Sequence, residues 1–437
     1  MRPFAIKPAS GLRGEVFLPG DKSIAHRAVM CGALSFGRTR IENFPANKDC
    51  LVTLSVFKKL GIKIIRRGGN VVVFGQGLHG LKGAKSPIFL GESGTTCRLA
   101  LGVLAGQDFQ TVLAAGRSLN QRPMLRVTNP LRMMGANIKA RRKGGEEFPP
   151  IIIRGGNLRG ISYKIPVASA QVKSAILLAG LYSFGTTCVI EILKTRDHTE
   201  RMMRLFKAGI RVKQNKIFVK GGRPLASPGT ITVPGDISSA AFFLVAGAVV
   251  PNSRILIKNV SLNPTRIGVI SVLKRMGAKI ELRKRKLRLP AFEPAGDILI
   301  KSSKLAATTI RRKEVPALID ELPVLMVAAS LAKGRSVFEG VGELRVKETD
   351  RIRSMIANLK NMGADIRVAG KKGSERIIIS SGALLQGGKV RSFGDHRTAM
   401  SMIIAGLAAR NNTFIDDISC ISKSFPGFVN ILAALKI

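Results

Sequence analysis

The apolar positions of this chain follow a pattern that recurs along its length. Five times, an amphipathic helix of period 3.6 is predicted to end at a glycine and to be followed by a short strand with alternating polarity. These glycines stand 68 to 86 residues apart: Gly61, Gly135, Gly209, Gly277 and Gly363. The first of the helices is expected over residues 51–60. Such regular spacing indicates a chain built from repeated units of about 70 residues.

A second pattern recurs in step with the first. A polar residue precedes a helix of small apolar residues six times, near Asp21, Glu92, Ser169, Asp236, Asp320 and Asp395. Residues 240–250 are apolar on every face, which is typical of a helix inside a protein. Each unit is therefore predicted to hold strands, one buried helix and one amphipathic helix. The sixth unit lacks the glycine pattern and is expected to end in a helix over residues 425–435.

Six such units suit two domains of three. A Pro-Gly pair occurs at Pro19-Gly20 and again at Pro234-Gly235, and we place two crossover hinges there. The prediction is an α/β (α+β repeat) protein. Residues 20–234 form one lobe, and residues 1–19 with 235–437 form the other, so that the first strand joins the C-terminal lobe. A single continuous array without a cleft is the alternative.

Composition narrows the class of protein. Apolar residues make up 45% of the chain, its mean hydropathy is +0.17, and its longest apolar run has 11 residues. A bilayer span needs about 20, and the N-terminus has no apolar signal core. The five cysteines are scattered without a C-x-x-C pair, and only four histidines occur. We therefore expect a soluble cytoplasmic protein without disulfides or a metal site.

The formal net charge of +44 favours anionic partners. Acidic metabolites are the first choice, because aromatic residues amount to only 5% and tryptophan is absent, which leaves few platforms for stacking bases. Weak, non-specific polyanion binding is compatible with this charge, but a specific nucleic-acid reader is not expected.

The polar residues around the buried helices are the candidate site. A cation in the first helical turn, such as Lys22, opposes the helix dipole by roughly 0.3–1 kcal/mol, unless an anion binds there. If six such helix ends meet in one cleft, they bring together Lys22, Ser23, Arg27, Ser169, Gln171, Asp320, His396 and Arg397. Ahead of the second helices stand Arg122, Arg196, Lys423, and Lys347 with Arg351, the last two expected on one helical face. Taken singly, each is equally a helix cap or a solvated charge.

Two carboxylates among these cations could transfer protons. Asp320 is expected to begin a buried helix, and Glu348 stands between Lys347 and Arg351. The G-x-G-x-x-G stretch at residues 75–80 does not predict a dinucleotide site, because Gly83 and Pro87 follow where a helix would have to begin.

Eight segments together resemble one family. They are residues 19–27, 93–96, 120–124, 168–174, 195–200, 319–323, 347–351 and 395–397. In this order and along the whole chain, the sequence resembles the 5-enolpyruvylshikimate-3-phosphate synthases (EPSP synthases). The resemblance implies the two-domain enolpyruvyl transferase fold, with three repeats in each domain and the active site in the interdomain cleft. It also implies a monomer that uses no cofactor.

The implied reaction transfers the enolpyruvyl group of phosphoenolpyruvate to the 5-hydroxyl of shikimate 3-phosphate and releases phosphate. It belongs to the shikimate pathway of aromatic amino acid biosynthesis. By resemblance, shikimate 3-phosphate would contact Lys22, Ser23, Arg27, Ser169, Ala170, Gln171, Arg196, Asp320 and Lys347. Phosphoenolpyruvate would contact Lys22, Gly94, Arg122, Gln171, Arg351, His396, Arg397 and Lys423. Asp320 resembles the base for the 5-hydroxyl, and Glu348 and Lys22 resemble the groups that protonate the methylene carbon.

The chain departs from the family pattern at three positions. Glu92 and Glu343 replace frequent asparagines, and Ala170 replaces a serine found in one subgroup. Glyphosate, which mimics phosphoenolpyruvate, is expected to inhibit, and Gly94→Ala to relieve that inhibition by crowding.

Two alternatives stay open at this point. The sister enzymes that act on UDP-N-acetylglucosamine have Lys-Asn in place of Lys22-Ser23 and a loop cysteine as acid, whereas Cys97 is expected on a helix. A polyanion-binding protein with the same fold and an inactive site is the other.

Overall fold

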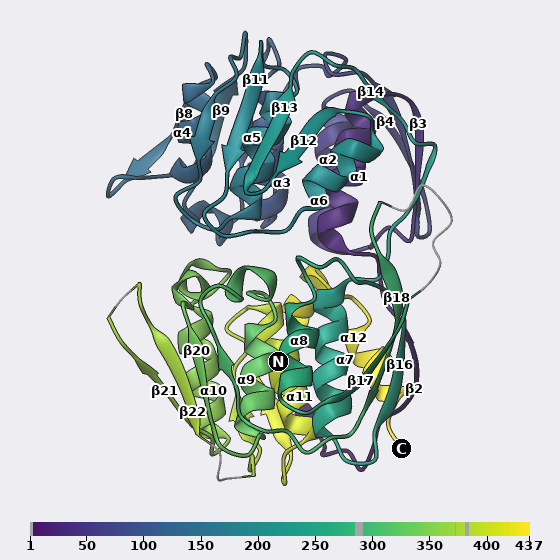
Figure 1. Ribbon diagram of the computed structural model, residues 1–437, viewed down its shortest axis with the longest axis vertical. Coiled ribbons are helices and arrows are strands. Elements are labelled where there is room, and N and C mark those ends of the chain that lie inside the picture. Colours follow the sequence, from purple (N-terminus) through teal and green to yellow (C-terminus); the bar gives the residue numbers. More distant parts are fainter. Residues whose placement is uncertain (1–2, 285–291, 372, 381–383) are drawn as a thin grey trace. The chain divides into compact units, whose positions relative to one another are not determined.

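The computed structural model describes residues 3–284, 292–371, 373–380 and 384–437. The chain divides into two compact units (Figure 1). The N-terminal unit comprises Gly20–Val233, and the C-terminal unit comprises the chain up to Pro19 and from Pro234 onward. One short stretch departs from this division, because Phe292 and Glu293 belong to the N-terminal unit. The buried Glu293 carboxylate lies 2.6 Å from Nδ1 of His198 there.

Three buried helices form the centre of the N-terminal unit (Figure 1). They are α1 (Lys22–Leu34), α3 (Gly94–Leu104) and α5 (Ala170–Gly180). From its third residue onward, every residue of α1 is buried. This agrees with the small, apolar composition that predicted buried helices, because such a helix loses hydrophobic stabilisation at every face that it exposes.

Three sheets surround these helices, and each mixes parallel with antiparallel strand pairs: the first has two parallel pairs, and the other two have one each. The first has the order β14 (Leu225–Ala226), β3 (Ser35–Glu42), β5 (Asn70–Gln76), β4 (Lys63–Arg67), with β15 (Thr230–Thr232) beside β3. The second has the order β6 (Ile88–Phe89), β7 (Gln110–Ala114), β9 (Glu146–Arg154), β8 (Asn137–Lys143). The third has the order β10 (Ser162–Lys164), β11 (Thr186–Ile190), β13 (Lys216–Lys220), β12 (Gly209–Lys213).

The amphipathic helices of this unit are α2 (Lys48–Lys59), α4 (Leu125–Met133) and α6 (His198–Leu205). Gly61 and Gly135 follow the first two with φ of 89° and 114°, the left-handed cap that the pattern predicted. The prediction is wrong at the third copy. Lys207 takes the left-handed conformation there, with φ of 61°, and Gly209 begins β12.

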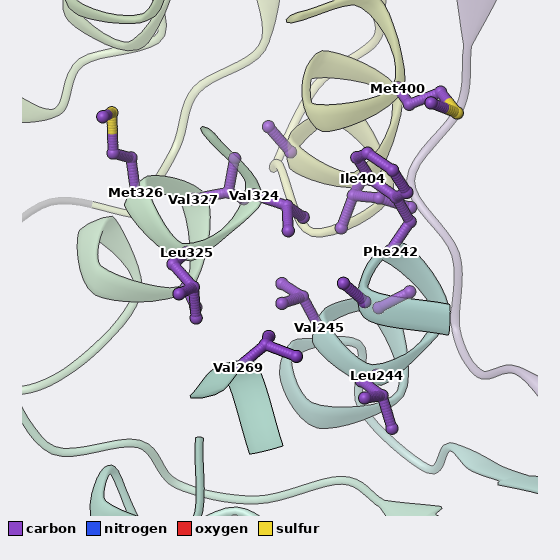
Figure 2. Packing of buried hydrophobic residues seen from close by; sticks show 14 of the residues in the cluster. Phe242, Leu244, Val245, Val269, Val324, Leu325, Met326, Val327, Met400 and Ile404 are labelled. Atoms are coloured by element: carbon purple, nitrogen blue, oxygen red, sulfur yellow. The ribbon is translucent and has the colours of Figure 1, made fainter. Parts of the chain in front are cut away.

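The C-terminal unit repeats this plan around α7 (Ile237–Val249), α9 (Leu322–Ser330) and α11 (His396–Leu407). Figure 2 shows Phe242 and Val245 of α7 and Ile404 of α11 pointing into the space that these helices share. Two sheets have four strands. One has the order β17 (Lys279–Lys284), β18 (Ala295–Lys301), β16 (Arg254–Ser261), β2 (Arg13–Phe17), and the other β19 (Thr309–Ile310), β20 (Arg335–Glu339), β22 (Arg376–Ser380), β21 (Asp365–Ala369).

The sixth repeat is shorter than the others. Its sheet contains β1 (Phe4–Ile6), β24 (Thr413–Ile415) and β23 (Gly388–Val390), and β1 pairs antiparallel with β24. The first strand thus joins the C-terminal unit. The amphipathic helices of the unit are α8 (Gly268–Arg275), α10 (Arg351–Asn361) and α12 (Phe428–Ala433). The last is shorter than the expected 425–435, because the 3₁₀ turn η4 (Ser419–Lys423) and the left-handed Gly427 precede it.

Among the described residues, no helix is both long enough and apolar enough to cross a bilayer.

Candidate functional site

Polar caps begin the three buried helices of the N-terminal unit. The Asp21 carboxylate accepts from the amide of Ile24 at 3.0 Å, and the Ser169 hydroxyl accepts from that of Val172 at 3.4 Å. At the second copy the cap is Ser93, so the expected start near Glu92 is one residue early. Lys22, Gly94 and Ala170 are therefore the first residues of α1, α3 and α5, where free backbone amides favour anions.

Lys22 has a carboxylate neighbour that the sequence did not indicate. Its Nζ lies 2.9 Å from Oδ2 of Asp49, and both side chains are largely buried, with about a fifth of each exposed. Asp49 belongs to the first turn of α2. The pair explains how a lysine can stand at the positive end of α1. Ser23 follows at the second position of the helix, partly exposed.

Arg27 is buried in the second turn of α1, with 4% of its surface exposed. Its Nε donates to the Thr199 hydroxyl at 2.6 Å, and Nη2 donates to the Ser174 hydroxyl at 2.7 Å. Burial, together with the positive charge of Arg196, lowers the pKa of Arg27 to about 10. The charges of Arg196, Glu200 and Asp21 thus all act on Arg27.

A second arginine group lies at the start of α3 and contains Gly94, Arg98, Arg122 and Gln171. A Cβ added at Gly94 would lie 2.6 Å from Nη1 of Arg122 and 2.9 Å from Nη1 of Arg98. Nη1 of Arg98 donates to Oε1 of Gln171 at 2.9 Å, and Nη2 donates to the carbonyl oxygen of Pro123 at 3.1 Å. Arg98 is 1% exposed. Arg98 thus links Gln171, which is expected to bind both substrates, to the loop that carries Arg122.

In the C-terminal unit, the side chain of Arg351 binds three carboxylates. The distances are 2.9 Å from Nε to Oδ2 of Asp395, 3.3 Å from Nη1 to Oδ1 of Asp320, and 2.5 Å from Nη2 to Oε2 of Glu348. Only 1% of the Arg351 side chain is exposed. Burial disfavours its charge, but the three carboxylates outweigh that effect and raise its pKa. We call Arg351, Asp320, Glu348, Asp395 and Arg397 the Arg351 cluster.

Arg397 joins the cluster from the first turn of α11. Its Nη1 donates to the carbonyl oxygen of Asp320 at 2.8 Å, and its Nε lies 3.8 Å from Oδ1 of the same residue. His396, the first residue of α11, is 4% exposed. Lys423 ends η4, and its Nζ donates to the carbonyl oxygen of Gly394 at 3.3 Å, just before the cap of α11.

Two expectations about the C-terminal residues are wrong in detail. Asp320 does not begin α9, since Glu321 is the N-cap and Leu322 the first helical residue. Lys347 and Arg351 do not share a helical face. Lys347 follows the 3₁₀ turn η3 (Gly342–Val346), and α10 begins only at Arg351. Asp350 is the N-cap of α10, so the helix begins after it and does not include Lys347.

Sequence reasoning also missed Arg266. It stands two residues before α8, at the place that Arg122, Arg196 and Lys423 occupy in other repeats, and it is 1% exposed. Its Nη2 donates to the Ser238 hydroxyl at 2.8 Å and lies 3.5 Å from Oδ1 of Asp236. The repeat could have predicted Arg266, because other copies have a cation at the corresponding position.

Comparison with known proteins identifies the family. The sequence pattern described as EPSP synthase (3-phosphoshikimate 1-carboxyvinyltransferase) matches residues 6–432. The chain belongs to the EPSP synthase family. It is 49% identical over 432 residues to the 3-phosphoshikimate 1-carboxyvinyltransferase of Citrifermentans bemidjiense, covering 99% of both chains. It is 48% identical to that of Bacillus cytotoxicus over 98% of this chain and 99% of that one.

Solved structures agree with membership in the EPSP synthase family. The EPSP synthase of Acinetobacter baumannii is 41% identical, with a TM-score of 0.86 over 100% of this chain and 98% of that one. The enolpyruvyl transferase NikO of Streptomyces tendae has a TM-score of 0.77 over 99% and 97% of the two chains. At 16% identity, NikO shows the shared fold alone.

The local structure also bears on the two motifs set aside earlier. Cys97 is fully buried on α3, as expected, and burial raises the pKa of its thiol to about 11. No helix follows the glycines at residues 75–80 before α3 begins at Gly94. Among the described residues, no three His, Cys, Asp or Glu side chains are grouped as a metal site would need.

Proposed function

We propose that this chain transfers the enolpyruvyl group of phosphoenolpyruvate to the 5-hydroxyl of shikimate 3-phosphate and releases phosphate, the activity of the family to which it belongs. The observation that carries the proposal is the Arg351 cluster. There, the two candidate proton-transfer groups, Asp320 and Glu348, bind one buried guanidinium. Cations within about 4–6 Å favour the ionised form of a carboxyl group, and only that form can accept a proton.

The proposed roles follow from this chemistry. The Asp320 carboxylate takes the proton of the 5-hydroxyl while the oxygen bonds to the substituted carbon of phosphoenolpyruvate. Lys22, together with Glu348 once its carboxylate has taken up a proton, delivers a proton to the methylene carbon, which gives a ketal that still bears phosphate. Breaking the carbon–oxygen bond to phosphate, while a methyl proton returns to the group that delivered it, restores the enol ether. Fixed cations stabilise the charges of this sequence without reorganising.

The substrate contacts are assigned to the groups described above. We assign shikimate 3-phosphate to Lys22, Ser23, Arg27, Ser169, Ala170, Gln171, Arg196, Asp320 and Lys347. We assign phosphoenolpyruvate to Lys22, Gly94, Arg122, Gln171, Arg351, His396, Arg397 and Lys423. The helix N-termini at Lys22, Gly94 and Ala170 support the anionic part of this assignment, because their backbone amides attract phosphate and carboxylate groups.

The activity test measures phosphate release by the purified chain with both substrates, and identifies the organic product by NMR. Release with UDP-N-acetylglucosamine in place of shikimate 3-phosphate would favour the sister activity. Binding of DNA without any turnover would favour the polyanion-binding alternative. Either result would overturn the proposed reaction.

The roles of the two carboxylates are tested by pH profiles of Asp320→Ala and Glu348→Gln. Loss of a general base or acid costs about 10²–10⁴-fold in rate. We expect each variant to lose turnover in that range, and Asp320→Ala to lose the rise of rate with pH that its ionisation causes. Asp365→Ala is the matched control, because Asp365 is an exposed acid on β21 of the same unit. Variants as active as this control would contradict the roles.

We further propose that the enzyme works as a cytoplasmic monomer and that its excess charge gives only weak, non-specific polyanion binding. The five cysteines are all free thiols, as in a reducing compartment. Sedimentation at several protein concentrations tests the monomer, and salt-dependent retention on DNA tests the polyanion binding.

A further inference from the structure

One face of the four-stranded sheet β17–β18–β16–β2 carries a row of like charges. In register, Arg13 of β2 lies opposite Arg254 of β16, Arg254 lies opposite Lys301 of β18, and Lys301 lies opposite Lys279 of β17. All four residues are exposed. We call them the basic row. Since neighbouring strands are about 4.8 Å apart, the row extends over roughly 14 Å.

Neighbours on the same face neutralise the positive charge of the row only in part. Like charges directly opposite each other destabilise a sheet. The nearest carboxylates stand two positions further along the strands. Glu281 binds Arg283 at 2.8 Å, and this bond, together with the charges of Lys301 and Arg254, lowers the pKa of Glu281. Glu15 lies 4.0 Å from Lys258. Within the described ranges, no ion pair includes a member of the basic row. The four cations of the row outnumber the two carboxylates beside it, and this excess of positive charge favours a ligand of opposite charge.

The basic row lies at the edge of a hollow. A cavity of about 620 Å³ is lined by all four members of the row. Its lining also includes one acid and one further cation, three polar residues and two apolar residues: Glu15, Arg283, Asn252, Ser253, Ser302, Leu256 and Leu299. This volume lies within the range of small-molecule sites, roughly 300–1,000 Å³. The cavity belongs entirely to the C-terminal unit, and none of its residues is among those assigned to the substrates.

From this geometry we infer that the basic row binds a linear polyphosphate chain, either inorganic or carried by a nucleoside triphosphate. Guanidinium and ammonium groups both bind phosphate oxygens through charge-assisted hydrogen bonds. Four cations in a line match several phosphates in a line better than one compact anion. The inference concerns a site separate from the proposed transfer reaction.

The test compares two variants that lose the same charge. Arg254→Gln/Lys301→Gln removes the two central cations of the row. Lys213→Gln/Lys216→Gln removes two exposed cations that lie opposite each other on β12 and β13 of the N-terminal unit. Each is titrated with inorganic tripolyphosphate by calorimetry at about 0.15 M ionic strength, where distant charges are screened. Thermal unfolding first confirms that both variants are folded.

We expect the unmodified chain to bind tripolyphosphate saturably, the Arg254/Lys301 variant at least tenfold more weakly, and the Lys213/Lys216 variant within twofold of the unmodified chain. Orthophosphate should bind at least tenfold more weakly than tripolyphosphate. A parallel titration with ATP distinguishes inorganic polyphosphate from a nucleoside triphosphate as the ligand. Equal affinity for ATP supports recognition of the chain alone, whereas tighter binding supports a nucleotide whose base rests on Leu256.

Two results would overturn the inference. Equal weakening in both variants, or no saturation up to 1 mM, would mean that only the diffuse net charge attracts the anion. A tripolyphosphate-dependent rise in KM for phosphoenolpyruvate that persists in the Arg254/Lys301 variant would assign the binding to the transfer site instead.

Discussion

Gly94→Ala is the sharpest perturbation of the proposed phosphoenolpyruvate contacts. Gly94 is the first residue of α3, in a backbone conformation open to alanine, so the substitution need not strain the helix. The new Cβ would lie 2.6 Å from Nη1 of Arg122, whereas ordinary contacts begin at 3.4 Å. The Arg122 guanidinium must therefore retreat by the difference between 3.4 and 2.6 Å, about 0.8 Å. Arg98 has less freedom to move, because it is buried and bound to Gln171.

A retreat of this size weakens or breaks a hydrogen bond between Arg122 and a bound carboxylate or phosphate. Hydrogen bonds to charged groups contribute about 1.5–3 kcal/mol, and each 1.4 kcal/mol changes an affinity about tenfold. We therefore expect the inhibition constant of glyphosate and the KM for phosphoenolpyruvate to rise by roughly 10- to 100-fold. The KM for shikimate 3-phosphate should change much less, because Arg122 is not assigned to that substrate.

The assay follows phosphate release at saturating shikimate 3-phosphate while phosphoenolpyruvate and glyphosate are varied. Gly69→Ala is the control, because a Cβ there meets no atom within 4 Å. Unchanged constants in Gly94→Ala, with an unfolding midpoint equal to that of the control, would refute the placement of phosphoenolpyruvate beside Gly94.

Three further outcomes are expected. Oε2 of Glu92 accepts from the amide of Leu119 at 2.7 Å and so fixes the turn before Arg122. Glu92→Ala should therefore raise the KM for phosphoenolpyruvate severalfold, and Glu92→Gln should restore it. Equal KM values in the unmodified chain and Glu92→Ala would contradict this. Burial lowers the pKa of His26 to about 3. As the pH falls, this imidazole therefore binds a proton in the unfolded chain before it does so in the folded chain. Between pH 6.5 and 5 the free energy of unfolding should fall by about 2 kcal/mol more than in His26→Gln, and parallel denaturation curves would contradict it. Cys97→Ala should keep turnover within about twofold, whereas a cysteine acid would lose it.

The parts of the fold that the sequence predicted correctly depend on local physics. The cap at Asp21 and the buried course of α7 need only the residues within one helix, a polar acceptor or an unbroken run of small apolar side chains. The repeat then extended each local prediction to its copies. Where a copy changed its local chemistry, as at Lys207 and Gly209, the prediction failed by one or two residues.

The site residues that the sequence missed are long-range partners. Asp49 reaches Lys22 from another helix, and Arg98 reaches Gln171 from another repeat. Neither pairing can be predicted from sequence periodicity, because each contact depends on how two helices pack and not on the spacing of residues along one helix. The shift of Lys347 off α10 has a related cause. The start of that helix is set by the Asp350 carboxylate, which caps it.

The buried arginines of the two units have different hydrogen-bond partners, and this difference bears on their proposed roles. Arg27 donates to the hydroxyls of Thr199 and Ser174 and to a carbonyl oxygen, and burial lowers its pKa. Arg351 is surrounded by three carboxylates, which raise its pKa. A phosphate beside Arg27 would add the counter-charge that hydroxyls cannot supply. A phosphate beside Arg351 would instead repel Asp320 and Glu348, so the binding of one substrate anion there favours proton uptake by these carboxylates. Substrate binding itself would thus prepare the Arg351 cluster for proton transfer.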